Sequence, residues 1–299
     1  MKRKKRGVNK EVVIIIVVAA FLLTFSLSQI IFNKNVNLAP SQPTQVKVQV
    51  GNAAPTITNL QAIPNVNLNP APSTTSVLVT FTASDANGAN DLVDATASAQ
   101  FTNTGEPTRA GTCSLQSTAG NEKTYQCSVS MNYFDKSGAW TATVSIADTQ
   151  AATAQSSSTL TVNLLRDISI NPVLINFPSV APGNTNVIPT DKTTITNNGN
   201  FEAPPGAILA IAYSLVGETN PAQIIPAGNF RIAGSSQIDV CGLGNSLTPS
   251  FPTAITTSAL SRGSTGNTET LSYCLTSVPD ISSQVYSAIG GSSWIITIS

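Results

Sequence analysis

The segment SVLVTFTASDANGANDL (Ser76–Leu92) contains the pattern that decides the fold. Its first half alternates apolar with polar side chains, as a half-buried β-strand does, and its second half is a loop of Asp, Asn and Gly. No segment after Phe32 has the 3.6-residue periodicity of an amphipathic helix. The sequence therefore predicts an all-β protein built from β-sandwiches. The other alternating segments are TYQCSVSM, WTATVSIAD, STLTVNLL, TTITN, AILAIAYSL and WIITIS.

A long apolar segment precedes this β-rich region. Residues 12–32 carry no charge, and about 20 helical residues, rising 1.5 Å each, cross a hydrocarbon layer of roughly 30 Å. Residues 1–11 hold six basic side chains and one acid, a flank that stays on the cytoplasmic side during insertion. The sequence predicts a cytoplasmic tail (1–11), a single transmembrane helix (12–32) and extracellular domains attached to the plasma membrane.

The apolar segment also has two alternative interpretations, both involving cleavage. In the first, the segment is a secretory leader, whose apolar core is ordinarily shorter than a transmembrane helix. Cleavage would then follow the small residues of Ser26-Leu27-Ser28. The segment KKRGV, followed by an acid and a long apolar helix, resembles the leader of a type IV prepilin that is cut after Gly7. In that case the apolar helices of many copies pack into a filament.

The remainder of the chain divides into a linker and two domains. Residues 33–54 are polar and punctuated by proline, which is typical of a short extended stalk. One strand ends and another begins near residue 165, so the predicted domains are residues 55–164 and 165–299. In the second domain, Asn198-Gly199 predicts a tight hairpin turn in which the glycine supplies a positive φ.

Two segments of the first domain resemble a known repeat. VTFTASDANGANDL and SGAWTATVSIADTQ match the immunoglobulin-like PKD repeat, in which a strand leads into an Asp/Asn-Gly loop and a late strand ends in Asp. The resemblance covers at most residues 55–163 and departs at DATASAQFTNTGEP. It implies an Ig-like β-sandwich for the first domain, and with the alternating segments of the second domain we expect two tandem Ig-like β-sandwich domains behind the transmembrane helix. An anchor followed by Ser/Thr/Asn-rich sandwiches is also similar to archaeal cell-surface proteins.

All four cysteines lie in the region predicted to be extracellular, where disulfides persist. Four cysteines allow three pairings. The spacing favours Cys113 with Cys127 and Cys241 with Cys274, because each pair then lies within one predicted domain.

One segment, DANGANDLVD (85–94), contains residue types that suggest a binding site. It places five oxygen-bearing side chains in ten residues, and Ca²⁺ takes 6–8 oxygen ligands from such loops. The spacing is not that of an EF-hand. We favour a capped turn, in which Asx side chains accept backbone N–H bonds and Gly88 makes the bend. The candidate calcium ligands are Asp85, Asn87, Asn90, Asp91 and Asp94.

Composition argues against several function classes. The chain contains no histidine, which excludes Ser-His-Asp, Cys-His and histidine-metal sites. Residues 35–299 hold eight basic and fourteen acidic side chains, a net charge of −6 without a basic cluster, so nucleic acid is not an expected partner. We expect no small-molecule substrate and no cofactor, apart from the calcium alternative. The expected function is non-enzymatic, either structural or adhesive. The expected partners are the membrane, through residues 12–32, and other envelope proteins or copies of the chain itself.

Overall fold

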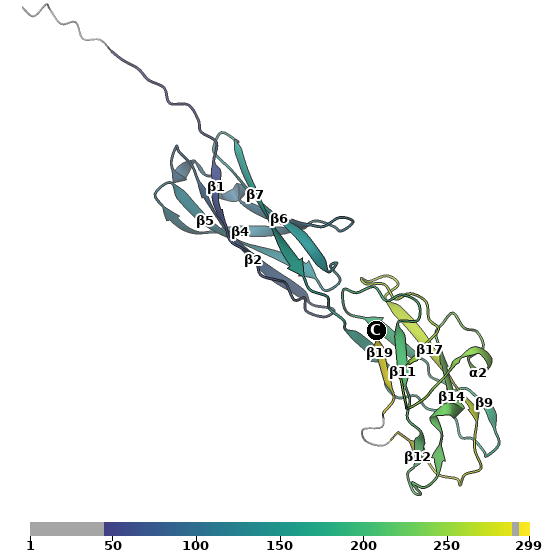
Figure 1. The fold of residues 1–299 in the computed structure, drawn as a ribbon. Coiled ribbons are helices and arrows are strands. Elements are labelled where there is room, and N and C mark those ends of the chain that lie inside the picture. Colours follow the sequence, from purple (N-terminus) through teal and green to yellow (C-terminus); the bar gives the residue numbers. More distant parts are fainter. Residues whose placement is uncertain (1–44, 289–292) are drawn as a thin grey trace, which may run out of the picture. The chain divides into compact units, whose positions relative to one another are not determined.

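The computed structural model describes residues 45–288 and 293–299 (Figure 1). The predicted cytoplasmic tail (1–11) and transmembrane helix (12–32) lie outside these residues, and the predicted stalk is described from residue 45 onward. Within the part of the chain that is described, no helix is long and apolar enough to cross a membrane.

The described chain contains two units of different character. Residues 45–51 belong to the first unit, contain no helix or strand, and are exposed. Residues 52–299 form the second, compact unit, which is almost entirely β-structure. The prediction of an all-β protein is therefore confirmed for the described residues.

The first seven strands form one antiparallel sheet in the order β1-β2-β5-β4-β3-β6-β7. An immunoglobulin-type sandwich places strands A, B, E and D in one layer and C, F and G in the other. Named A to G along the chain, β1–β7 have that arrangement, so the topology is Ig-like. The strands are Thr56–Leu60 (β1), Thr74–Ser84 (β2), Ser98–Thr102 (β3), Arg109–Ala119 (β4), Glu122–Asn132 (β5), Gly138–Ala147 (β6) and Thr153–Val162 (β7).

The sheet folds back on itself around one hydrophobic cluster. Val66, which follows β1, pairs with Val162 of β7, so the two edge strands meet. Every second residue of β2, β5 and β6 is buried, as the period of two in a strand requires. The Phe81 and Tyr125 rings stack with centroids 5.2 Å apart. Trp140 is 1% exposed, and its indole N–H donates to the Lys136 carbonyl.

The strand order determines which loops share an end of this sandwich. In the sheet, β5, β4 and β3 lie between β2 and β6, and each neighbouring pair is antiparallel. Because the strand direction reverses four times from β2 to β6, these two strands run in the same direction and finish at the same end. β1 begins there too, because Thr56 pairs with Ser84 at the end of β2. The loop after β2, the loop after β6 and the entry of the chain therefore lie together.

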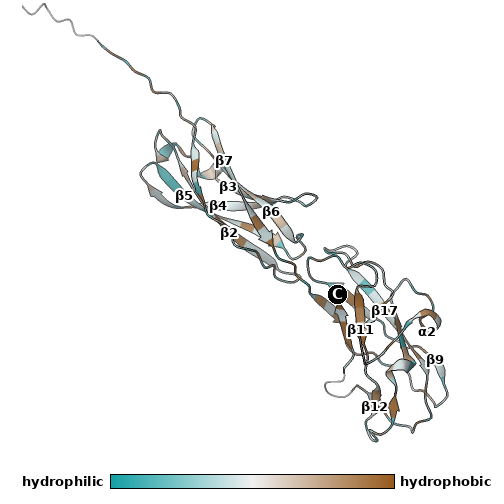
Figure 2. Cartoon of the chain, in the orientation of Figure 1, coloured by the Kyte–Doolittle hydropathy of each residue, from teal (hydrophilic) through white to brown (hydrophobic). Residues whose placement is uncertain are grey.

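The rest of the compact unit surrounds a second hydrophobic cluster, to which β11 contributes hydrophobic residues (Figure 2). The main sheet has the order β15-β14-β17-β10-β8, with β9 also paired to β17; two three-stranded sheets have the orders β16-β11-β19 and β13-β12-β18. The domain boundary at residues 164 and 165 stays a prediction. The strands are Ile168–Asn171 (β8), Thr185–Val187 (β9), Thr193–Asn197 (β10), Ile208–Ile211 (β11), Leu215–Gly217 (β12), Ile224–Ile225 (β13), Phe230–Ala233 (β14), Asn245–Ser246 (β15), Thr253–Ala254 (β16), Thr268–Ser277 (β17), Tyr286–Ser287 (β18) and Ile295–Ile298 (β19).

Both predicted disulfides are present. Cys113 of β4 lies directly opposite Cys127 of β5, and the two are bonded across this hairpin. Cys241, in the short helix α2 (Val240–Leu243), is bonded to Cys274 of β17. The second bond attaches α2 to the main sheet.

The predicted role of Gly199 is wrong. Its φ is not among the positive values, so the glycine is not required for a left-handed turn. A Cβ at Gly199 would instead lie 2.2 Å from the Leu165 carbonyl oxygen and 3.1 Å from the Asp167 nitrogen. The glycine is needed because two backbone segments approach each other closely.

We expect Gly199→Ala to lower the free energy of unfolding by about 1–3 kcal/mol, because the added methyl group must displace backbone. Gly228→Ala is the matched control: a Cβ at Gly228 meets nothing within 4 Å, and its φ is not positive. Denaturant unfolding of both variants measures the difference. Equal stability of the two would contradict the assigned role of Gly199.

Candidate metal centre

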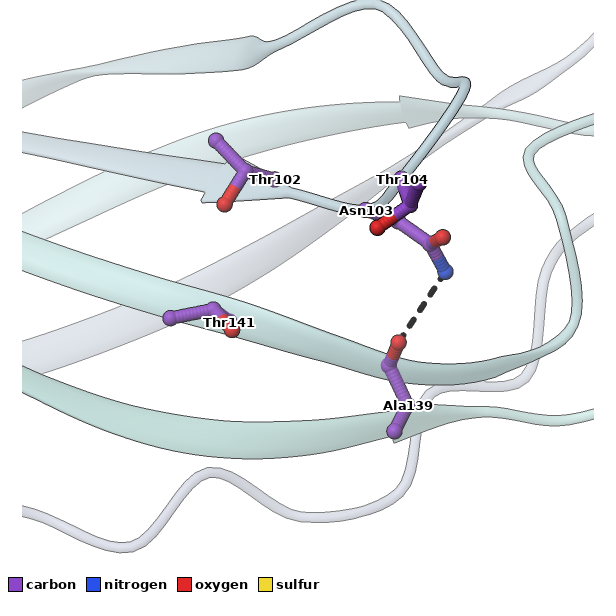
Figure 3. A pocket seen from close by; sticks show the side chains of 5 residues that line it. All are labelled: Thr102, Asn103, Thr104, Ala139 and Thr141. Carbon is purple, nitrogen blue, oxygen red and sulfur yellow. Dashed lines mark hydrogen bonds between the residues drawn. The ribbon is translucent and has the colours of Figure 1, made fainter.

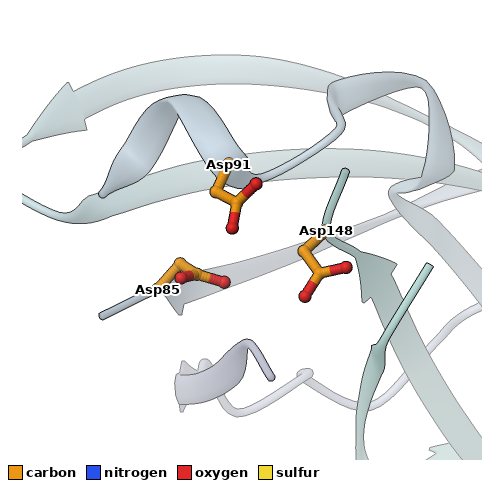
Figure 4. A group of neighbouring side chains, drawn as sticks. All are labelled: Asp85, Asp91 and Asp148. Atoms are coloured by element: carbon orange, nitrogen blue, oxygen red, sulfur yellow. The ribbon is translucent and has the colours of Figure 1, made fainter. Parts of the chain in front are cut away.

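Three aspartates from two loops meet at the end of the first sandwich where β2 and β6 finish (Figure 4). Asp85 directly follows β2, Asp91 closes the short 3-10 helix Ala89–Asp91, and Asp148 directly follows β6. One carboxylate oxygen from each lies within 4.8 Å of the others. The arrangement follows from the strand order, since β2 and β6 end at the same level.

Asp85 is the most deeply buried member, with 1% of its surface exposed. Its Oδ1 accepts a hydrogen bond of 2.8 Å from the Asn87 amide, which closes an Asx turn. Its Oδ2 is also buried, and it has no hydrogen-bond partner among the described residues. A buried acceptor without a partner costs free energy unless something else binds it.

Asp148 is held in place by three hydrogen bonds and is 3% exposed. Its Oδ1 accepts from the amides of Gln150 (2.9 Å) and Ala152 (2.8 Å). Its Oδ2 accepts from the Asn52 side-chain amide at 2.7 Å. The Asn52 hydrogen bond, and then the two amides, lower the pKa of Asp148 even though burial opposes them. The carboxyl group is therefore ionised at neutral pH.

Asp91 is half-buried and is attached to the loop after β6. The Thr149 hydroxyl donates to Asp91 Oδ1, and the Thr149 amide donates to the Asp91 carbonyl at 2.9 Å. Because Thr149 follows Asp148, this pair of bonds fixes Asp91 and Asp148 relative to each other.

Among the described residues, no basic side chain forms an ion pair with the cluster. Within the described residues, the ion pairs of Lys and Arg involve Asp94, Glu106, Asp135 and Glu202, and none reaches Asp85, Asp91 or Asp148. Ionised carboxylates this close together repel one another. The arrangement is therefore suited to a cation with oxygen ligands.

The structure separates Asp94 from the other predicted ligands. Asp94 Oδ1 accepts from Lys123 Nζ and from the Tyr125 hydroxyl, both at 2.7 Å, so this candidate ligand is bound by protein groups and is not part of the three-aspartate cluster. Burial acts to raise the pKa of Asp94, but the bonds from Lys123 and Tyr125 and the charge of Lys123 lower it overall. Burial and the neighbouring Asp94 carboxylate raise the pKa of Tyr125. This carboxylate is already neutralised by protein groups.

The two asparagines among the candidate calcium ligands, Asn87 and Asn90, are not members of the three-aspartate cluster. Asn87 Oδ1 accepts from the Ala53 amide at 2.8 Å, which ties the entry of the chain to the loop after β2. Asn90 is exposed. The residue that sequence reasoning missed is Asp148, although the resemblance to a late strand ending in Asp was a signal that could have indicated it.

The described residues also line two hollows elsewhere. A polar hollow of about 360 Å³ lies where Asn103 Nδ2 donates to the Ala139 carbonyl at 3.0 Å (Figure 3). Its lining is Thr102, Asn103, Thr104, Ala139 and Thr141, which carry no charge. A larger, mostly apolar hollow of about 1120 Å³ lies in the second cluster beside Phe230, Tyr273 and Trp294, and Glu218 is the one carboxylate among its described lining residues.

Comparisons with known proteins do not assign a family. No protein-family model matches the chain, and neither does any curated protein. Among solved structures, the tandem Ig domains A164-A165 of titin are similar over 83% of this chain and 97% of the titin chain. The identity is 9% and the TM-score is 0.26. Dimeric latent PorU from Porphyromonas gingivalis is similar over 86% of this chain and 21% of the PorU chain. The identity is 14% and the TM-score is 0.27.

A third match is the secreted serine protease VesC from Vibrio cholerae, over 78% of this chain and 48% of its own, at 9% identity and a TM-score of 0.21. This chain spans less than half of PorU and of VesC. Scores this low support no argument, so the Ig-like assignment depends on the strand order.

Proposed function

We propose that the chain is a non-enzymatic cell-surface protein in which residues 12–32 anchor the β-sandwich structure to the outside of the plasma membrane. The observation that carries the proposal is the pair of disulfides, Cys113–Cys127 and Cys241–Cys274. Disulfides persist in oxidising compartments and are rare in the cytosol. The basic residues before the apolar segment support an inside location of the N-terminus.

The proposed role is structural or adhesive. Ser and Thr are frequent on the exposed faces of β2 and β7. Charged residues make up 10% of the chain, and the absence of histidine removes the commonest general base. The proposed partners are other envelope proteins or further copies of this chain, in an envelope similar to that of archaea. A PKD-like character of residues 55–164 is part of the proposal, supported by the resemblance of the segments around β2 and β6 and by the Ig-like strand order.

A filament subunit is the alternative, favoured by Gly7 ahead of an acid and a long apolar segment. In that function the leader is cut after Gly7, and the apolar segments pack together in a filament. The β-sandwich structure would then cover the filament surface.

Intact-mass analysis of protein purified from its membrane distinguishes these functions. We expect the mass of a chain that retains residues 1–34, because a basic flank followed by 21 uncharged residues is a membrane anchor. A chain starting at Val8 would favour the filament, and one starting at Gln29 would show a secretory leader. As a control for orientation, a label at the C-terminus should be accessible to protease from outside intact cells.

A further inference from the structure

We propose that Asp85, Asp91 and Asp148 bind one Ca²⁺ ion, which fastens the entry of the chain to the first sandwich. The three carboxylates come from two loops that meet only in the folded protein, so they form a preassembled set of oxygen ligands. The independent observation is Asp85 Oδ2, a buried oxygen that has no hydrogen-bond partner among the described residues. A cation at the cluster would bind this oxygen.

The kind of cation follows from the ligands. All four cysteines are in disulfides and the chain has no histidine, so soft and borderline metals have no preferred ligand here. Three carboxylates supply three to six oxygens, and Ca²⁺ completes its 6–8 ligands with carbonyl oxygens and water. Mg²⁺ demands strict octahedral geometry and gives up its water reluctantly, so a cluster of three protein carboxylates favours Ca²⁺.

The position of the site indicates what the ion does. Asn52 donates to Asp148 Oδ2, and the Ala53 amide donates to Asn87 in the loop that carries Asp85 and Asp91. Both bonds attach the chain just before β1 to groups around the carboxylates. A bound ion removes the repulsion that would open these loops, and it therefore holds Asn52 and Ala53 in place.

The binding test uses the full-length chain, first stripped with a chelator and then titrated with CaCl₂ in a calorimeter. We expect one ion per chain, with a Kd on the order of 0.1–1 mM, as in extracellular calcium modules. At ten times Kd the melting temperature should rise by roughly 3–6 °C. Wild-type protein that neither binds nor shifts in 10 mM CaCl₂ would overturn the proposal. An equal shift in MgCl₂ would overturn the choice of calcium.

Matched variants test the ligands. Asp85→Asn and Asp148→Asn keep the side-chain shape, and we expect each to weaken calcium binding at least tenfold and to abolish the melting shift. Asp94→Asn is the control, because its carboxylate belongs to the same loop but binds Lys123 and Tyr125; its calcium shift should remain. If either buried variant does not fold, Asp91→Asn, at the half-buried position, gives the same test. Loss of the shift in Asp94→Asn, or its retention in the cluster variants, would refute the assignment.

Hydrogen exchange tests the fastening role separately. Calcium should slow exchange of the Ala53 amide in the wild type and not in Asp148→Asn. If calcium binds while the Ala53 amide exchanges at an unchanged rate, the ion does not fasten the entry of the chain. These outcomes are independent of the anchor, because they are measured on purified protein whatever its first residue.

Discussion

Asp135→Ala is expected to lower the free energy of unfolding by about 3–5 kcal/mol, because it leaves the largely buried Arg109 guanidinium, 16% exposed, without its counter-charge. Asp135 is 0% exposed, and its two oxygens accept from Arg109 Nε at 3.1 and 2.9 Å. Its Oδ2 also accepts from the Asn132 amide at 2.9 Å. The substitution therefore removes the acceptor of both Arg109 and Asn132. Denaturant unfolding measures the loss.

Two comparisons show whether the buried charge is the cause. Glu202→Ala removes an exposed carboxylate whose partner Arg262 still pairs with Glu106, and it should cost no more than about 1 kcal/mol. Adding Arg109→Met to Asp135→Ala should recover much of the loss, since the uncompensated charge is then gone as well. An Asp135→Ala variant as stable as Glu202→Ala would show that this ion pair contributes little.

The first sandwich was predictable because its strands are long and half-buried. In β2, β5 and β6, burial alternates with side-chain direction, so the pattern of Val77, Val79 and Phe81 is visible in the sequence itself. The second cluster is less regular. Strands such as Ile224–Ile225 and Thr253–Ala254 are two residues long, and a period of two cannot be recognised in so short a segment.

The candidate metal centre was only half predictable, because its three aspartates meet through contacts between distant strands. Asp85 and Asp91 are close in sequence, and a local search finds them. Asp148 joins them only because β6 runs in the same direction as β2, so that both strands end at the same end of the sandwich. Asp94 was a candidate because its partner Lys123 lies 29 residues away on β5, and the sequence does not show that pairing.

Replacing both Cys241 and Cys274 by alanine is expected to lower the free energy of unfolding by about 3–4 kcal/mol, since the bond closes a long loop in the unfolded chain. The two cysteines are 33 residues apart, against 14 for Cys113 and Cys127, and in the chain-entropy model the longer loop contributes more. Cys274 is fully buried beside Ala233 and Val240, so alanine also leaves a small cavity there.

The measurement is thermal and denaturant unfolding of this variant and of the corresponding Cys113→Ala/Cys127→Ala variant, each with and without reductant. We expect the Cys241/Cys274 variant to be the less stable of the two, and reductant to have a smaller effect on each variant than on the wild type. The same estimates bear on the proposed location outside the membrane. A chain that loses both bonds in a reducing cytosol would lose a large share of the 5–15 kcal/mol that ordinarily stabilises a folded protein. If reduction left the wild type as stable as before, the disulfides would no longer be an argument for the outer side of the membrane.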